Sequence, residues 1–338
     1  MRQRLTSIAL LLALVFTVAC NERPVGPADG ARMSTRGITL ADWTPDGYAS
    51  PSSMSGIDAI AALGANTLVL IVTAYQDDAS GSDLAPDPQR TPGSAALQVA
   101  EQRAVANGMR VVIKPHVDLE SGEWRGTIGP RDAAAWFEAY AAFVVPLASF
   151  AESINAATFV VGTELAGTIT HDARWRELIA EVRAVFSGSL AYAASWDEMQ
   201  LVPFWDALDL TGVDFYAPVA TNDEPRRLDI LKAWQPWLNR LEILHGQTNK
   251  PILLTEIGYR SIDGAGARPF EFGTGAGLDP AEQADLYWAA IEAVAGKDWI
   301  DGVMWWNWLA SGRGGIDNDD YTPQGKPAET ELHDAWSG

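Results

Sequence analysis

The sequence predicts an α/β protein that folds as a single (β/α)8 barrel. Short apolar runs recur eight times along 338 residues, and amphipathic stretches separate most of them. The run at 67–72, Thr-Leu-Val-Leu-Ile-Val, shows the character of these segments. A continuous hydrophobic run of this kind is typical of a parallel strand buried on both faces. Eight alternating strand and helix units favour closure of the sheet into a barrel.

The eight expected strands are rich in aliphatic and β-branched residues and lie at 37–43, 67–73, 110–116, 158–164, 190–196, 210–216, 251–256 and 302–308. Asn107 and Gly108 should end the helix that begins near Pro92. Asp-Pro-Ala-Glu at 279–282 offers an N-cap, a first-turn proline and a capping-box glutamate. The unit between the fifth and sixth strands leaves room for only a turn or two of helix.

An open, doubly wound sheet uses the same alternation of strand and helix and is the alternative architecture. Its nucleotide-binding form places a glycine-rich turn after the first strand. Here Asp-Trp-Thr-Pro at 42–45 follows that strand instead. The sequence therefore favours the barrel.

The N-terminus has the features of an export signal. Arg2 and Arg4 precede an apolar run at 8–19 that is too short for a permanent membrane span. Small residues before Cys20, the only cysteine, resemble a bacterial lipobox, although Thr17 stands where leucine is usual. We expect a signal peptide over 1–20 with a lipid on Cys20, or otherwise a soluble secreted product. A polar tether at 21–36 and a catalytic barrel at 37–338 should follow.

Composition limits the partners. The net charge is −20, from 44 acidic and 24 basic residues, so nucleic acids and anionic membranes would be repelled. We expect a neutral substrate, a monomer, and membrane contact only through Cys20. The four histidines show no metal-ligand spacing, and neither a metal nor a cofactor is expected. The acidic run at 317–320 could hold a cation, but solvated loop acids are the simpler interpretation.

Polar and aromatic residues end the expected strands, where the loops of a barrel build its active site. Glu164 ends Phe-Val-Val-Gly-Thr-Glu, and Glu256 ends Ile-Leu-Leu-Thr-Glu. A carboxylate after an apolar run is costly to bury unless it is used or paired. On the fourth and seventh strands, the two would face each other across the mouth. That arrangement suits retaining glycoside hydrolysis, which needs two carboxyls about 5–5.5 Å apart. A purely structural role for both is the alternative.

These motifs resemble a known family. Val-Gly-Thr-Glu-Leu and Leu-Thr-Glu-Ile-Gly-Tyr are similar to the clan of retaining β-glycosidases that share this barrel. Ile-Lys-Pro-His at 113–116 and the tail at 320–329 resemble glycoside hydrolase family 113, whose characterised members are β-1,4-mannanases. The likeness extends from about 37 to 336.

The resemblance implies roles for single residues. Glu164 would be the general acid/base and Glu256 the nucleophile. Trp43 and Trp196 are substrate-binding candidates from their places at strand ends, and the resemblance implies that Lys114, His116, Tyr216, Trp306 and Trp308 bind substrate or support the nucleophile. Lys114 and His116 would lie near the subsite before the scissile bond, Tyr216 would hydrogen-bond the nucleophile, and Trp306 or Trp308 would form the platform. Thr163 replaces the asparagine that in much of the clan contacts the sugar 2-hydroxyl.

The leading hypothesis is therefore an exported, endo-acting β-1,4-mannanase that works by double displacement. The same mechanism on a glucan, xylan or galactan is one alternative. A surface lipoprotein that binds glycans without cleaving them is another, although binding alone has no use for the glutamate pair. The glycine-rich segment 259–278 could be a flap over the site or a disordered loop.

Overall fold

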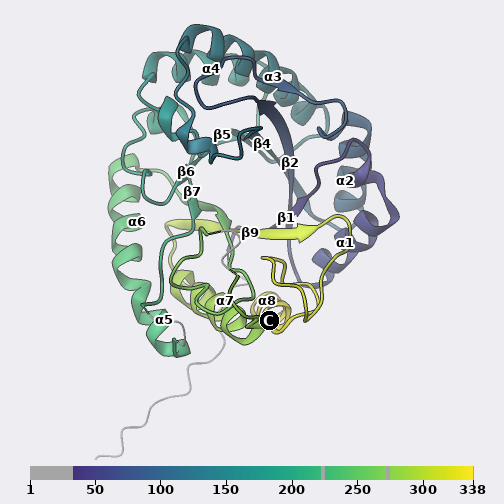
Figure 1. Cartoon of the computed structure of the whole chain (residues 1–338), viewed down its shortest axis with the longest axis vertical. Helices are drawn as coiled ribbons and strands as arrows, with labels where there is room; N and C mark the ends of the chain where they lie inside the picture. The colour runs from purple at the N-terminus through teal and green to yellow at the C-terminus, as the bar shows by residue number, and fades with distance from the viewer. Residues whose placement is uncertain (1–32, 222–224, 272–274, 338) are drawn as a thin grey trace, which may run out of the picture.

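The computed structural model describes residues 33–221, 225–271 and 275–337. Eight parallel strands close into a barrel, because β1 pairs with both β2 and β9. Figure 1 looks along this barrel and shows the helices as a ring outside the strands. The predicted (β/α)8 fold is confirmed. The expected signal peptide, Cys20 and most of the expected tether lie outside the described residues.

The strands are β1 Thr35–Ala41, β2 Thr67–Gln76, β3 Ala85–Pro86, β4 Arg110–Leu119, β5 Thr158–Thr163, β6 Ser189–Ser195, β7 Leu210–Phe215, β8 Ile252–Ile257 and β9 Ile300–Leu309. The eight expected strands correspond to all of these except β3, a short antiparallel addition to β2. The first strand begins at Thr35, inside the stretch assigned to the tether. That boundary was wrong because Thr35 and Arg36 pair with β9.

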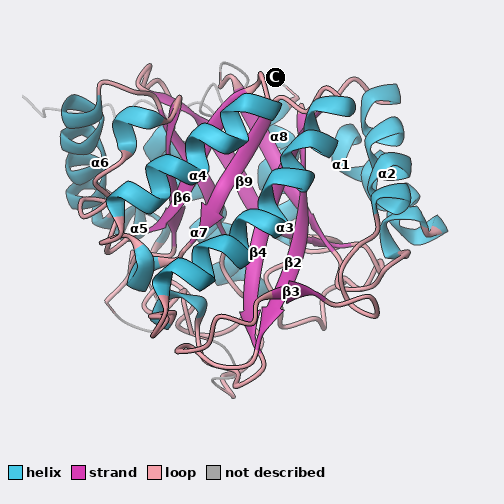
Figure 2. Cartoon of the chain, turned by 90° about the horizontal axis from the view of Figure 1, so that it is seen from above, coloured by secondary structure: helices cyan, strands magenta, loops and turns pink. Residues whose placement is uncertain are grey.

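The helices are α1 Pro51–Ala62, α2 Ser94–Ala106, α3 Ala133–Ser153, α4 Asp172–Val185, α5 Arg227–Ala233, α6 Gln235–Thr248, α7 Pro280–Val294 and α8 Pro327–Trp336. As expected, Asn107 and Gly108 close α2: Asn107 is its C-cap, and Gly108 has a positive φ of 78°, which suits glycine. The unit between β6 and β7 holds only the 3-10 turn η5, Trp205–Ala207. In the side view, the helices flank the strands along their length (Figure 2).

Helix α3 is long and apolar enough to cross a membrane by length and composition. Its Trp136, Tyr140 and Val144 are fully buried, and the helix packs on β4 and β5. Its apolar character is thus explained by its place against the barrel wall.

Two apolar clusters hold the barrel together. The larger lies between strands and helices. The smaller contains only strand residues, so it fills the barrel interior: Val69, Val112, Val160, Ala191, Ala193, Leu253 and Met304. Side chains alternate between the two faces of a strand. Residues two and four positions after Val112 on β4 therefore also point inward, nearer the C-terminal mouth.

The segment 259–278 is anchored where the structure describes it. The sequence suggested that Glu282 completes a capping box on α7, but the structure shows that its side chain binds elsewhere. Its buried carboxylate accepts hydrogen bonds from the N–H groups of Gly264 and Gly266, at 2.9 and 3.0 Å. Ile262 and Leu278 form an antiparallel bridge. These contacts tie the segment to α7, which argues against a free flap in the described parts.

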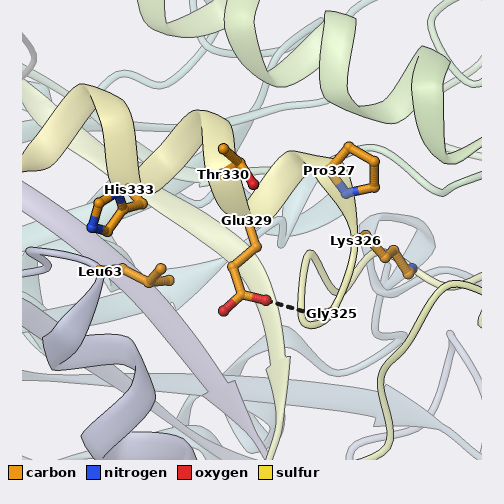
Figure 3. A pocket seen from close by; sticks show the side chains of 7 residues that line it. All are labelled: Leu63, Gly325, Lys326, Pro327, Glu329, Thr330 and His333. Atoms are coloured by element: carbon orange, nitrogen blue, oxygen red, sulfur yellow. Dashed lines mark hydrogen bonds between the residues drawn. The ribbon is translucent and has the colours of Figure 1, made fainter.

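Glu282→Gln should lower the free energy of unfolding by about 1–3 kcal/mol, because its amide nitrogen would face a buried N–H donor. Urea unfolding measures this change. Glu329 is the matched control: it accepts the N–H of Gly325 at 2.6 Å at an exposed site (Figure 3), where water can replace it. Equal losses in the Glu282→Gln and Glu329→Gln variants would contradict the anchoring role.

Candidate functional site

A pocket of about 460 Å³ opens among the loops at the C-terminal ends of the barrel strands. Both predicted carboxylates line it, Glu164 directly after β5 and Glu256 within β8. These are the fourth and seventh barrel strands, as expected. The remaining lining residues are His116, Trp124, Arg125, Ser195, Trp196, Asp197, Tyr216, Phe270, Trp306 and Tyr321.

The backbone at the end of β5 sets the direction of Glu164. The pairing of β5 with β6 shifts between Val160 and Thr163, and Glu164 itself has a left-handed φ of 52°. Its N–H donates to the carbonyl of Ala193 at 2.8 Å. Such a conformation is uncommon outside glycine and costs energy that the surrounding contacts must offset. One carboxylate oxygen, Oε2, accepts the indole N–H of Trp124 at 3.0 Å.

The surroundings of Glu164 favour its protonated form. Burial has the largest effect and raises the pKa of this carboxyl above its ordinary value of 4.5. The positive charge of Arg125 opposes that rise, whereas the negative charge of Glu256 adds to it. Glu164 is therefore suited to donate a proton.

Glu256 is held from below by a buried lysine. The pairing of β7 with β8 skips Thr255, so a bulge there turns both Thr255 and Glu256 toward the barrel axis. The ammonium of Lys114 donates to Oε1 of Glu256 at 2.5 Å and to the carbonyl of Thr255 at 3.2 Å. It also contacts both oxygens of Asp214, at 2.9 and 3.2 Å.

This geometry differs from the expected place of Lys114 beside the substrate. Its side chain is fully buried and does not line the pocket. Inward alternation from Val112 places Lys114 one layer below the mouth, where Asp214 from β7 meets it. Lys114 thus supports Glu256 instead of contacting sugar.

One lysine cation between two buried carboxylates separates their proton affinities. Burial would raise the pKa of Glu256, but Lys114 and His116 together lower it well below the ordinary range. For Asp214, burial and the charge of Glu256 raise the pKa, and Lys114 only partly offsets them. Glu256 accordingly stays ionised beside a proton-donating Glu164, which is the division of labour that acid and nucleophile need.

Two neutral donors complete the surroundings of Glu256. The hydroxyl of Tyr216 donates to Oε2 at 2.8 Å, as expected from the sequence. His116 is buried, and burial with the nearby Arg125 charge lowers its pKa to about 4, so it is neutral near pH 7. Arg125 can only donate, and its Nη1 lies 3.0 Å from Nδ1 of His116. The imidazole hydrogen therefore sits on Nε2, which faces Oε1 of Glu256 at 3.4 Å.

Aromatic side chains form the walls of the pocket. Trp306 stacks near His116, with ring centroids 5.7 Å apart, and Trp196 stacks on Phe270 at 6.2 Å. Trp43, which is 37% exposed, meets the edge of Trp306 at the rim. Flat aromatic faces with a few polar groups suit a sugar, whose rings carry both C–H faces and hydroxyls.

Trp308 does not belong to this site. Simple alternation would place it on the same face as Trp306, but β9 carries one extra residue in its pairing with β1. Ile38 pairs with Trp305 and Leu40 with Trp308, so both of these tryptophans turn outward into the larger core cluster. Trp306 alone of the two candidates can serve as a platform.

Thr163, which replaces the asparagine that contacts the sugar 2-hydroxyl in much of the clan, also faces away from the pocket. Its buried hydroxyl donates to the carbonyl of Pro115 at 2.9 Å, and the residue does not line the pocket. The acidic run at 317–320 is likewise engaged in structural contacts, since Asp319 pairs with Arg260 and Asn318 contacts Lys326.

A second hollow, of about 690 Å³, lies on the outer flank between the end of α1 and the start of α8 (Figure 3). Its lining residues are Leu63, Gly325, Lys326, Pro327, Glu329, Thr330 and His333. Glu329 is its single carboxylate, and Lys326 is turned inward to Ser261. This hollow therefore lacks the pair of carboxyl groups that retaining glycoside hydrolysis needs.

Comparison with known proteins agrees with this geometry. The sequence model of Glycoside Hydrolase Family 113 matches residues 41–326. The chain belongs to glycoside hydrolase family 113. It is therefore a glycoside hydrolase, and the family expected from the motifs is confirmed.

Solved structures extend the likeness of this family 113 enzyme. The β-mannanase AaManA of Alicyclobacillus acidocaldarius, in complex with ManMIm, shares 26% identity over 90% of this chain and 97% of its own, with a TM-score of 0.83. A second family 113 β-1,4-mannanase reaches 0.84 at 26% identity, covering 90% and 99%. A family 5 mannosidase of Rhizomucor miehei, 10% identical over 90% and 92%, shares the fold at 0.58. A search of curated proteins gives no match.

Sequence reasoning missed several lining residues of the family 113 site. Trp124 lies in the loop after β4 and Arg125 begins the short 3-10 turn η3, Arg125–Thr127, while Phe270 and Tyr321 come from segments far along the chain. The segment Gly-Glu-Trp-Arg-Gly at 122–126 was the available signal, because it lies in the loop that follows the strand containing Lys-Pro-His.

Proposed function

We propose that this glycoside hydrolase is a retaining β-1,4-mannanase in which Glu164 is the acid/base and Glu256 the nucleophile. The observation that carries the proposal is one pocket lined by two carboxyls whose surroundings shift their pKa values in opposite directions. Similarity to solved family 113 β-1,4-mannanases supports the choice of mannan.

The reaction follows from the contacts. Glu164 protonates the glycosidic oxygen while a carboxylate oxygen of Glu256 attacks the anomeric carbon, and the bond to the leaving sugar breaks. Lys114 holds Oε1 of Glu256 at 2.5 Å from below the pocket, whereas Oε2 accepts from Tyr216, which lines the pocket; we therefore assign the attack to Oε2. In the second half, Glu164 takes a proton from water as the water displaces Glu256, and the configuration is retained.

Product analysis tests the proposal. Purified enzyme is incubated with mannan, glucan, xylan and galactan, and NMR follows the first anomer released. The proposal expects manno-oligosaccharides with the β-anomer appearing first. Initial release of the α-anomer would overturn the retaining mechanism, and cleavage of another glycan alone would overturn the substrate.

The pH dependence of kcat/KM should be asymmetric. Because the pKa of Glu256 is lowered and that of Glu164 is raised, activity should persist on the acid side and fall tenfold per pH unit once Glu164 ionises. Glu164→Gln should remove the basic limb and lower kcat/KM for poor leaving groups by about 10²–10⁴-fold.

A matched control for Glu164→Gln is Glu198→Gln. Glu198 is a half-buried neighbour. Its pKa is raised to about 7 by burial and by the negative charge of Asp197. The Glu198→Gln enzyme should keep its basic limb, with circular dichroism confirming the fold at each pH. If the Glu198→Gln enzyme loses the basic limb, that limb reports the ionisation of Glu198 and not of Glu164.

We also propose that the enzyme is exported and carries a lipid on Cys20. The support is the sequence at 2–20. The wild-type protein should incorporate a palmitate analogue, and the Cys20→Ser variant should not. Absence of incorporation in the wild-type protein would overturn the lipid anchor.

A further inference from the structure

The side chain that contacts Glu164 belongs to an exposed tryptophan in a different loop. Trp124 is 45% exposed at the mouth, and its Nε1 lies 3.0 Å from Oε2 of Glu164. An indole N–H can donate but cannot accept. Oε2 must therefore act as an acceptor whether Glu164 is protonated or ionised.

The consequence concerns where the acid proton sits. The carbonyl oxygen of a protonated carboxyl accepts a hydrogen bond better than its hydroxyl oxygen does, so the contact from Trp124 to Oε2 favours the O–H of protonated Glu164 on Oε1. A carboxyl that rotates freely could present either oxygen, and only one orientation would be productive. Fixing one oxygen removes the unproductive orientation, which is how positioned groups increase the rate in general acid–base catalysis.

The loop is built to hold Trp124 in this place. The next residue, Arg125, is fastened through Nη1 to His116 at 3.0 Å and through Nη2 to Asp118 at 2.6 Å. Both the N–H and the hydroxyl of Thr127 donate to the carbonyl of Trp124.

Two glycines let the parts approach. A Cβ on Gly126 would lie 2.2 Å from the Trp124 ring, so the indole folds over a position that tolerates no side chain. A Cβ on Gly167, in the turn that follows Glu164, would lie 2.3 Å from the carbonyl of Ile128. The Trp124 loop and the Glu164 loop are therefore packed directly on each other.

We propose that Trp124 is a positioning residue that holds Oε2 of Glu164 and so assigns the catalytic proton to Oε1. The proposal rests on the proposed role of Glu164 as acid/base. This role differs from that of an aromatic platform under a sugar ring, which would change the affinity for substrate and not the proton transfer.

The test compares Trp124→Phe with wild type on aryl β-mannobiosides whose leaving groups differ in pKa. Phenylalanine keeps an aromatic face and removes the donor. For a poor leaving group, which needs the acid, kcat/KM should fall by about 10- to 100-fold. For a dinitrophenyl leaving group, which does not, it should stay within about threefold. The N–H lowers the pKa of Glu164, so its loss should move the basic limb to higher pH.

Gly126→Ala provides an independent variant, because the added methyl should displace the indole and give the same signature. In the double variant the two effects should not add, since both act through one hydrogen bond. Trp43→Phe, at the same rim without a contact to Glu164, is the matched control; it should show the leaving-group dependence of wild type.

The outcomes are distinguishable. If wild type cleaves the mannobiosides but Trp124→Phe changes KM alone, or slows all leaving groups equally, the positioning role is overturned and the proposed function stands. If wild type cleaves none of them, the substrate proposal fails; the same series is then run on the aryl β-glycoside that it does cleave. If wild type cleaves no aryl β-glycoside, both proposals are overturned.

Discussion

Replacing Glu256 by glutamine is expected to lower kcat on mannan by about four to six orders of magnitude, because an amide oxygen is a far weaker nucleophile than the carboxylate that bonds to the sugar. Glutamine has nearly the same shape, and its carbonyl oxygen can still accept from Lys114 or Tyr216. The variant should therefore fold. Steady-state kinetics on mannan together with urea unfolding measure both properties.

The matched control is Glu242→Gln on the exposed face of α6, which should keep wild-type activity. Azide adds a chemical readout. With Glu256→Ala and an activated β-mannobioside, azide should occupy the vacated space and give the α-mannobiosyl azide. With Glu164→Ala, the β-azide is expected, since Glu256 still forms the intermediate. Exchange of the two products would reverse the assigned roles.

Lys114→Met should damage both stability and activity. Removing the cation leaves the buried carboxylate of Glu256 and the buried carboxyl group of Asp214 without their common partner. Breaking a buried ion pair from one side costs about 3–5 kcal/mol. Because Lys114 lowers the pKa of Glu256, its loss should also raise the pH at which the nucleophile ionises. We expect the acid limb of kcat/KM to move upward and the plateau to fall by at least about tenfold.

Two further variants separate stability from catalysis. Lys326→Met removes another buried lysine, but one that donates to the neutral oxygens of Ser261 and Asn318 and to the carbonyl of Asp320. It should lose stability without moving the acid limb. The double variant Lys114→Met/Asp214→Asn removes one carboxylate together with the cation, so it should be more stable than Lys114→Met alone. An unchanged acid limb in Lys114→Met would contradict the role of this lysine.

The barrel and its two glutamates could be predicted because their signals are local. Each strand is a short apolar run, and Glu164 and Glu256 each stand alone at the end of one. The cost of burying such a carboxylate makes its position informative without any knowledge of the fold. The order of strands then places both at the mouth.

The role of Lys114 could not be predicted, because it depends on contacts between distant strands. Its partners Asp214 and Glu256 lie 100 and 142 residues away in the sequence. Whether an inward lysine meets substrate or a buried acid depends on its layer within the barrel. That layer is set by strand register, which apolar runs do not specify at the level of single residues.

Trp306 and Trp308 show the same limit. Alternation alone gives them one face, and only the extra residue in the pairing of β9 separates them. Trp124 was missed for a different reason. It lies in an irregular loop, where no periodicity exists to reveal which way a side chain points.

The central claim is that Glu256 forms a covalent bond to the sugar, and trapping that intermediate tests it most directly. A 2-deoxy-2-fluoro β-mannobiosyl fluoride should form the intermediate faster than it is released, because the 2-fluorine slows both steps while fluoride leaves readily. Digestion and mass spectrometry should then find the fluorinated disaccharide on Glu256, and Glu256→Gln should remain unlabelled. A label on another residue, or turnover of the reagent with no labelled enzyme at any time, would contradict this account.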